Sequence, residues 1–270
     1  MAYARSGDTD VFYTATGGPG PALVLAHGFL MDSSMFAKQV SALAGRMRIM
    51  AWDARGHGQT RDDGNLFTYW DLAADTFAVM DAAGLAHAYV GGMSQGGFSA
   101  LRAALIDPVR VDGLVLIGTA ASACSPEDVA AYRELFEAWF GDEPLAPTVE
   151  ELAVQLIGGT ETDRAPWAAQ WLASDRDRIF NAAAACLVER DDVTARLGEI
   201  RCPALVIRGG HDQDIVRMAS EALCAGLVNS GSLLEVSGAG HAVNWTHPEP
   251  VNNAISAFLG SADRRPQSVF

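Results

Sequence analysis

Gly92-Met93-Ser94-Gln95-Gly96 is the stretch of this sequence that decides the fold. Residues 86–91 before it are short and partly apolar and predict a buried strand, whereas residues 97–105 after it predict a helix. A serine on a sharp strand-to-helix turn keeps its hydroxyl exposed, and glycines two residues to either side leave room for the turn. A glycine-rich turn with an incidental serine is the alternative, but the strand–turn–helix context favours Ser94 as a nucleophile.

A serine hydroxyl is a weak nucleophile at neutral pH, so it needs a base, and the base needs an orienting acid. Among the six histidines, His241 ends a glycine-rich loop just after a strand predicted over 232–237. Asp212 follows a strand predicted over 203–209, and Asp214 is a close rival two residues on. We therefore expect a triad in the chain order Ser94, Asp212 and His241.

Catalysis by such a serine also needs two donors for the negative charge that develops on the carbonyl oxygen. One should be the backbone N–H of Gln95, immediately after the serine. An apolar strand predicted over 22–27 leads into an early turn, and the N–H of Phe29 in that turn is expected to be the second donor. Phe29 is inferred from its position, because a backbone donor has no side-chain signature.

These segments together resemble the α/β-hydrolase superfamily over about Val11 to Leu259, including the loop Asp53-Ala54-Arg55-Gly56-His57-Gly58. Within it, the chain is similar to the small bacterial enol-lactonase-like and non-haem haloperoxidase-like serine esterases. The resemblance implies an α/β fold with a mostly parallel central sheet flanked by helices. It also implies that the loop around His57 is mainly structural, and we expect His27 to brace the oxyanion turn.

Two relatives on the same fold fit less well. Haloalkane dehalogenases and epoxide hydrolases carry an aspartate where this chain has Ser94, so opening of alkyl halides or epoxides is disfavoured. Proline iminopeptidases carry Gly-Gly-Pro-Gly in the oxyanion turn. Here Gly17-Gly18-Pro19-Gly20 lies before the strand that leads to His27 and predicts a loop between two strands.

The alternation of strands and helices predicts a hydrolase core over 1–122 and 201–270, interrupted by a helical cap over 123–200. The cap contains no convincing strand, and one of its helices has a start signal at Ser125-Pro126-Glu127-Asp128. Aromatic residues there are more often cap core than pocket wall. Some must still line the cavity of an enzyme, and the candidates are Trp139, Trp167 and Trp171, with Trp245 beyond the cap.

Composition narrows the class of protein further. The 270 residues are 49% hydrophobic, yet no apolar run reaches the length of a membrane span. A net charge of −14, with Lys38 as the single lysine, argues against nucleic acid or an anionic membrane as a partner. The four cysteines form no close pair, so we expect no metal and a reduced, cytoplasmic setting. The oligomeric state is left open, with a homodimer as one option.

We expect a serine hydrolase that cleaves a carboxylic ester or lactone of a small, largely apolar substrate through an acyl-enzyme on Ser94, with no cofactor. Carbon–carbon bond cleavage, amide hydrolysis or perhydrolysis on the same triad remain alternatives. A ligand-binding sensor with slow turnover is another, because it would keep the same residues.

Overall fold

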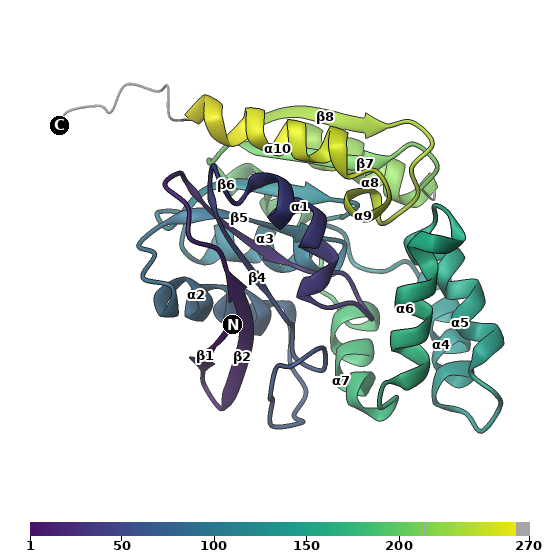
Figure 1. Ribbon diagram of the computed structural model, residues 1–270. Coiled ribbons are helices and arrows are strands. Elements are labelled where there is room, and N and C mark those ends of the chain that lie inside the picture. Colours follow the sequence, from purple (N-terminus) through teal and green to yellow (C-terminus); the bar gives the residue numbers. More distant parts are fainter. Residues whose placement is uncertain (213, 263–270) are drawn as a thin grey trace, which may run out of the picture.

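A computed structural model describes residues 1–212 and 214–262; in it, the side chains of residues 185, 186, 214, 215, 231, 232, 261 and 262 are not described. The core is an eight-stranded sheet in the order β1-β2-β4-β3-β5-β6-β7-β8 (Figure 1). Its strands are β1 (Ala2–Ser6), β2 (Thr9–Ala15), β3 (Ala22–Ala26), β4 (Arg48–Trp52), β5 (Ala88–Met93), β6 (Val111–Ile117), β7 (Ala204–Gly209) and β8 (Ser230–Val236).

Strands β3 to β8 pair in parallel, and β1 and β2 form an antiparallel edge. Every residue of β3 and β5 is buried, as expected for central parallel strands that are covered on both faces. The sheet confirms the predicted fold class. Strand β1 was not predicted, because it is short and exposes Ala2, Tyr3 and Arg5 on the edge of the sheet.

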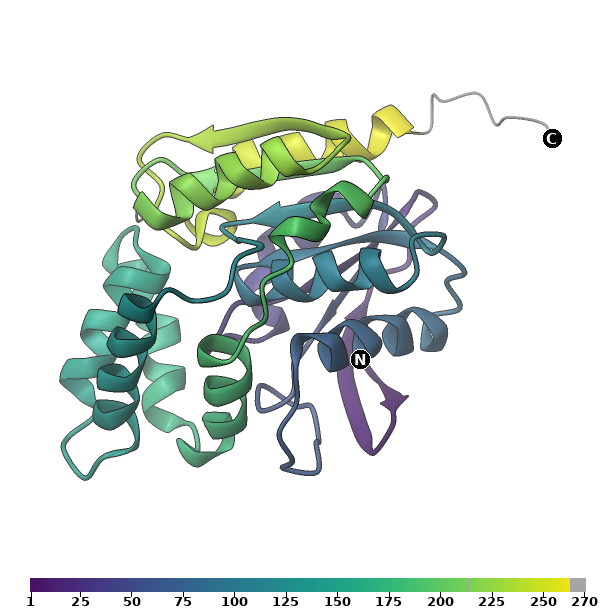
Figure 2. The ribbon, with the colours of Figure 1, turned by 180° about the vertical axis from the view of Figure 1, so that it is seen from behind.

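Helices cover both faces of the sheet, as two opposite views show (Figures 1 and 2). Helices α1 (Ala37–Leu43) and α10 (Pro248–Ala262) lie on one face, and α2 (Tyr69–Ala82), α3 (Gln95–Ile106) and α8 (Asp214–Gly226) lie on the other. Helix α2 begins with a complete capping box between Thr68 and Asp71. Short helical turns η1 (Ser33–Phe36), η5 (Thr194–Glu199) and α9 (Val243–Thr246) complete the core.

The segment between β6 and β7 is helical and stands beside the carboxyl ends of the parallel strands (Figure 1). It contains α4 (Pro126–Phe140), α5 (Ala146–Leu152), α6 (Glu161–Ala173), η3 (Asp177–Ile179) and α7 (Phe180–Ala182). Two π-helical turns, η2 (Ala153–Ile157) and η4 (Ala183–Val188), extend α5 and α7. Helix α4 begins with the capping box of Ser125 and Asp128, at the start signal seen in the sequence.

Polar contacts hold the helical segment to the core. Arg178 donates hydrogen bonds to the carbonyl oxygens of Gly58 and Thr60, in the loop after β4. Arg102, on α3, is 1% exposed and binds Asp191 at the end of the helical segment, with 2.6 Å between Nη2 and Oδ1. A buried cation with a bonded carboxylate partner is costly to break, so this pair fixes where the chain returns to the core. None of the helices described here is long and apolar enough to cross a membrane.

Candidate active site

Ser94 lies between the last residue of β5 and the first residue of α3, with φ of 52°. This left-handed conformation is costly for a residue with a side chain, and Leu30 is the only other non-glycine residue in the described chain that adopts it. A Cβ on Gly92 or Gly96 would lie 2.3 or 2.0 Å from the carbonyl oxygen of Ala26. The two glycines are therefore required for the close approach of the turn to β3, as the sequence motif implies.

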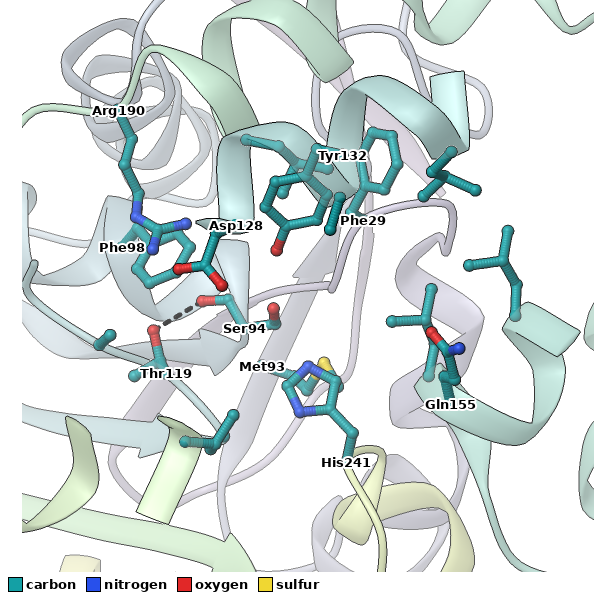
Figure 3. A pocket seen from close by; sticks show the side chains of 18 of the residues that line it. Phe29, Met93, Ser94, Phe98, Thr119, Asp128, Tyr132, Gln155, Arg190 and His241 are labelled. Carbon is teal, nitrogen blue, oxygen red and sulfur yellow. Dashed lines mark hydrogen bonds between the residues drawn. The ribbon is translucent and has the colours of Figure 1, made fainter. Parts of the chain in front are cut away.

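Both backbone groups of Ser94 are held by hydrogen bonds. Its N–H donates to the carbonyl oxygen of Ile117 over 2.8 Å, and Thr119 Oγ1 donates to its carbonyl oxygen over 2.7 Å (Figure 3). These bonds balance part of the conformational strain and fix the direction of the serine side chain. Thr119 was not predicted as a site residue. The signal for it was a polar side chain just after β6, the strand that follows the Ser94 motif in the sequence.

His241 pairs with Asp212 across two loops. Nδ1 of His241 is 2.9 Å from Oδ2 and 3.2 Å from Oδ1 of Asp212. An ionised carboxylate can only accept, so Nδ1–H donates and Nε2 is left as the basic nitrogen. The Asp212 side chain is 2% exposed, which keeps water from competing for this bond. The side chain of the alternative acid, Asp214, lies outside the described part of the structure.

A glycine gives the imidazole of His241 its space. Gly118 has φ of +54°, and a Cβ on it would lie 3.3 Å from Nδ1 of His241. Ser94 and His241 line the same cavity (Figure 3). Among the described residues, Ser94 Oγ forms no hydrogen bond with the ring. Such contacts are often long before substrate binds and shorten in the reacting complex.

The early turn presents the second predicted donor. Phe29 is 7% exposed and lines the cavity. Leu30, at φ of 65°, donates its N–H to Nε2 of His57 over 3.1 Å, so this N–H is already engaged. Within the described residues, the N–H groups of Phe29 and Gln95 have no acceptor. Two free backbone donors beside the serine can serve as an oxyanion hole.

Two buried histidines brace this turn against the loop after β4. His27 accepts from the N–H of Ala54 at Nε2 and donates from Nδ1 to the carbonyl oxygen of Gly28, over 2.9 and 2.7 Å. Nδ1 of His57 donates to the carbonyl oxygen of Arg55 over 2.9 Å. Burial lowers the pKa of His57 to about 3, so its ring is neutral and can accept from Leu30. Both histidines position the turn, which agrees with the structural roles expected from the sequence.

A cavity of about 520 Å³ opens above Ser94 and His241, between the core and the helical segment. Apolar side chains form much of its wall, and four acidic or basic side chains join them. Its lining includes Phe29, Met31, Met93, Phe98, Asp128, Tyr132, Glu134, Leu135, Glu151, Leu152, Gln155, Leu156, Leu187, Arg190 and Val216. Its walls are therefore more polar than the sequence indicated.

The four tryptophans that we expected to line the pocket lie outside it. Trp139, Trp167 and Trp171 are at most 2% exposed and fill the packing within the helical segment. Trp171 also donates from Nε1 to the carbonyl oxygen of Leu30 over 2.7 Å. Trp245 packs edge-on against Trp167 at 5.5 Å between ring centroids. The prediction differs from the structure because a large indole buries more apolar area when it packs between helices than when it borders an open cavity.

The charged residues of the cavity wall were not predicted from the sequence. Asp128 was recognised only as part of a helix start, and Arg190 was not singled out. No group of three or more histidine, cysteine or carboxylate side chains within residues 1–212 and 214–262 is arranged to hold a metal ion.

Several known proteins are similar to this chain in sequence and fold. A pimeloyl-[acyl-carrier protein] methyl ester esterase of Xanthomonas oryzae pv. oryzae is 31% identical over 90% of this chain and 97% of its own. A 3-oxoadipate enol-lactonase of Acinetobacter baylyi is 25% identical over 88% of each chain. The crystal structure of a thermophilic esterase from Thermogutta terrifontis is 27% identical and superposes with a TM-score of 0.84 over 94% of each chain. The model of the alpha/beta hydrolase fold family matches residues 21–248, and the chain belongs to this family.

Proposed function

We propose that this protein is a serine hydrolase that cleaves a carboxylic ester or lactone through an acyl-enzyme on Ser94. One observation carries the proposal: a strained serine and a histidine bound to a buried aspartate face the same cavity. Relatives named as a methyl ester esterase, an enol-lactonase and an esterase support acyl chemistry on carbon–oxygen bonds.

In this mechanism, Oγ of Ser94 attacks the carbonyl carbon while Nε2 of His241 takes its proton. Asp212 holds the tautomer with a proton on Nδ1 and stabilises the imidazolium that forms. The N–H groups of Phe29 and Gln95 bind the oxyanion, and removing one such donor from a serine protease of another fold costs about 3 kcal/mol. His241 then protonates the leaving alcohol, and a water activated by the same nitrogen releases the acid.

The helical segment shapes the acyl or alcohol pocket in this scheme. Phe136 on α4 packs edge-on against Phe29, with ring centroids 6.4 Å apart. The segment therefore touches the oxyanion turn, yet it holds none of the proposed triad. Substrate selectivity is expected to respond to substitutions there, while the chemical step is expected to depend on the core.

The test is hydrolysis of p-nitrophenyl esters of increasing acyl length and of a panel of lactones, with Ser94→Ala as the blank. Wild-type turnover and its loss in the variant would support the proposal, provided that the variant keeps the wild-type melting temperature. A fluorophosphonate probe should label Ser94 and no other serine. Labelling of a different serine, or full activity of Ser94→Ala, would refute the assignment.

A further inference from the structure

Arg190 is a fixed cation in the cavity wall. Its Nε donates to the carbonyl oxygen of Ser122 over 2.8 Å, and its Cζ lies 4.5 Å from the ring centroid of Phe98. The neighbouring Asp191 is bound by the buried Arg102, which fixes the backbone beside it. Arg190 is thus held in place before any ligand binds, and a ligand gains affinity from a group whose ordering cost is already met.

Most of the terminal N–H donors of Arg190 are left for a ligand. A guanidinium carries five N–H donors, and the bond to Ser122 uses one of them. One terminal donor is shared with the hydroxyl of Tyr132, whose pKa this hydrogen bond lowers. Within the described residues, the terminal nitrogens form no ion pair with a carboxylate, so most of their N–H groups are available to a ligand. Figure 3 shows the guanidinium reaching into the cavity on the side opposite His241, above Ser94.

Asp128 and Tyr132, from α4, lie beside this guanidinium (Figure 3). Oδ2 of Asp128 accepts from the N–H of Ser125 over 3.1 Å, which leaves Oδ1 able to accept from a ligand. Burial raises the pKa of Tyr132 most strongly, the charge of Asp128 raises it further, and the charge of Arg190 and a hydrogen bond from it lower it. The phenol therefore keeps its proton and can donate. This end of the cavity presents donors and an acceptor side by side.

The balance of charge in the cavity disfavours an anionic ligand at this end. Asp128, Glu134 and Glu151 line the cavity, and Arg190 is the one lysine or arginine among its lining residues. A carboxylate bound to Arg190 would lie beside the carboxylate of Asp128, and like charges at short range oppose binding. A neutral group with both an acceptor and a donor would satisfy Arg190 and Asp128 together.

We infer that the substrate carries a neutral carboxamide-like group, with its oxygen bound by Arg190 and its N–H bound by Asp128, at the end of the cavity away from His241. This inference deepens the proposed function and rests on it, because it names the substrate of the same site. Arg190 and Asp128 are then residues that determine specificity, and the ester or lactone carbonyl lies at Ser94.

The experiment uses three series of p-nitrophenyl esters whose acyl chains end in a methyl, a carboxamide or a carboxylate group, matched in length. The wild-type protein should hydrolyse a carboxamide ester of suitable length with the highest kcat/KM. Arg190→Met should lower kcat/KM for that ester by about 10- to 100-fold, the usual effect of losing a hydrogen bond to a charged group. It should change the methyl ester little. Arg133→Met, an exposed arginine on the same helix as Asp128 that does not line the cavity, is the matched control.

Asp128→Asn tests the role of charge, because asparagine can still accept at the start of α4. This variant should weaken the preference for carboxamide over carboxylate by raising kcat/KM for the carboxylate ester. If wild-type protein prefers the carboxylate ester and Asp128→Asn leaves that preference unchanged, Arg190 is an anion site and the inference is wrong. If methyl and carboxamide esters are used equally well at every length, the inference is also wrong.

Binding to Ser94→Ala separates this inference from the proposed function. Calorimetric titration of this variant with the intact esters needs no turnover. If Ser94→Ala binds the carboxamide ester more tightly than the other esters, and adding Arg190→Met removes this preference, the inference is supported. This holds even if the wild-type protein hydrolyses no ester, a result that would refute only the proposed function. Efficient hydrolysis of simple esters with equal binding of all three series would refute the inference alone.

Discussion

His57 should make the folding stability of this protein depend on pH. Burial lowers the pKa of its ring from 6.5 to about 3, so the folded protein keeps it neutral while the unfolded chain binds a proton below pH 6.5. Its stabilising contribution is therefore complete above pH 6.5 and is lost progressively as pH falls towards 3. A difference of this size corresponds to about 5 kcal/mol at 1.36 kcal/mol per pH unit, and about 2 kcal/mol of it is lost by pH 5.

The structure gives the reason why the proton cannot be accommodated. Nδ1 of His57 donates to the carbonyl oxygen of Arg55, and Nε2 accepts the N–H of Leu30. A second proton would have to bind at Nε2, where it would face the N–H of Leu30. The side chain is also 4% exposed, so water cannot hydrate a charged ring. Charging it requires the loss of the Leu30 bond, and the oxyanion turn would have to move.

The assay is urea unfolding of wild-type protein and of His57→Gln at pH 8, 7, 6 and 5, followed by two probes to establish two-state behaviour. Wild-type protein should be the more stable at pH 8, because the substitution removes ring packing against Phe29 and His27. That difference should shrink by about 2 kcal/mol at pH 5, since only the wild type has the histidine. A difference that stays constant from pH 8 to pH 5 would show that protonation of His57 does not destabilise the folded protein in this range.

Three further substitutions test the proposed machinery. Asp212→Asn should lower kcat by about three to four orders of magnitude because it favours the wrong histidine tautomer, while Asp214→Asn should be nearly silent; the opposite result in steady-state kinetics would exchange the two roles. Gly118→Ala should cost about 1–2 kcal/mol of stability through its left-handed φ and also lower kcat by crowding His241, whereas Gly84→Ala, at φ +69° in open space, should cost stability alone. Thr119→Val should lower kcat about fivefold by removing one hydrogen bond to the carbonyl of Ser94, since one hydrogen bond contributes about 1 kcal/mol, and Thr119→Ser should restore it; a Thr119→Val enzyme with wild-type kcat would remove Thr119 from the site.

The core of this fold was predictable because its informative residues are close in sequence to the strands that carry them. The turn at Ser94 requires glycines for steric reasons, and these glycines can be recognised directly in the amino-acid sequence. His27 directly follows β3 and His57 lies in the loop after β4, and parallel strands bring such ends to one edge of the sheet. In the core, the local sequence pattern agrees with the geometry of the sheet, so the sequence is sufficient to predict the positions of these residues.

The helical segment was less predictable because one amphipathic helix has three environments. On α4, Trp139 is buried in the packing of the segment, Tyr132 and Leu135 line the cavity, and Arg133 is exposed. Helical periodicity separates apolar from polar faces, but it does not distinguish an apolar face that meets another helix from one that meets a cavity. The pattern therefore cannot separate aromatic residues that belong in the packing, such as Trp139, from those that line the cavity.

Arg190 illustrates a further kind of information that local patterns lack. Its position depends on Asp191, and Asp191 is fixed by Arg102, which is 89 residues away in the sequence and lies on the helix that begins after Ser94. Phe98, on the same helix, supplies the ring beneath the guanidinium. Helix α3 thus positions the serine at its start and, through Phe98 and Arg102, the cation proposed to bind the far end of the substrate. If both roles are correct, the distance between the reacting carbonyl and the carboxamide is set by one rigid helix, and the preferred acyl length should be sharply defined rather than broad.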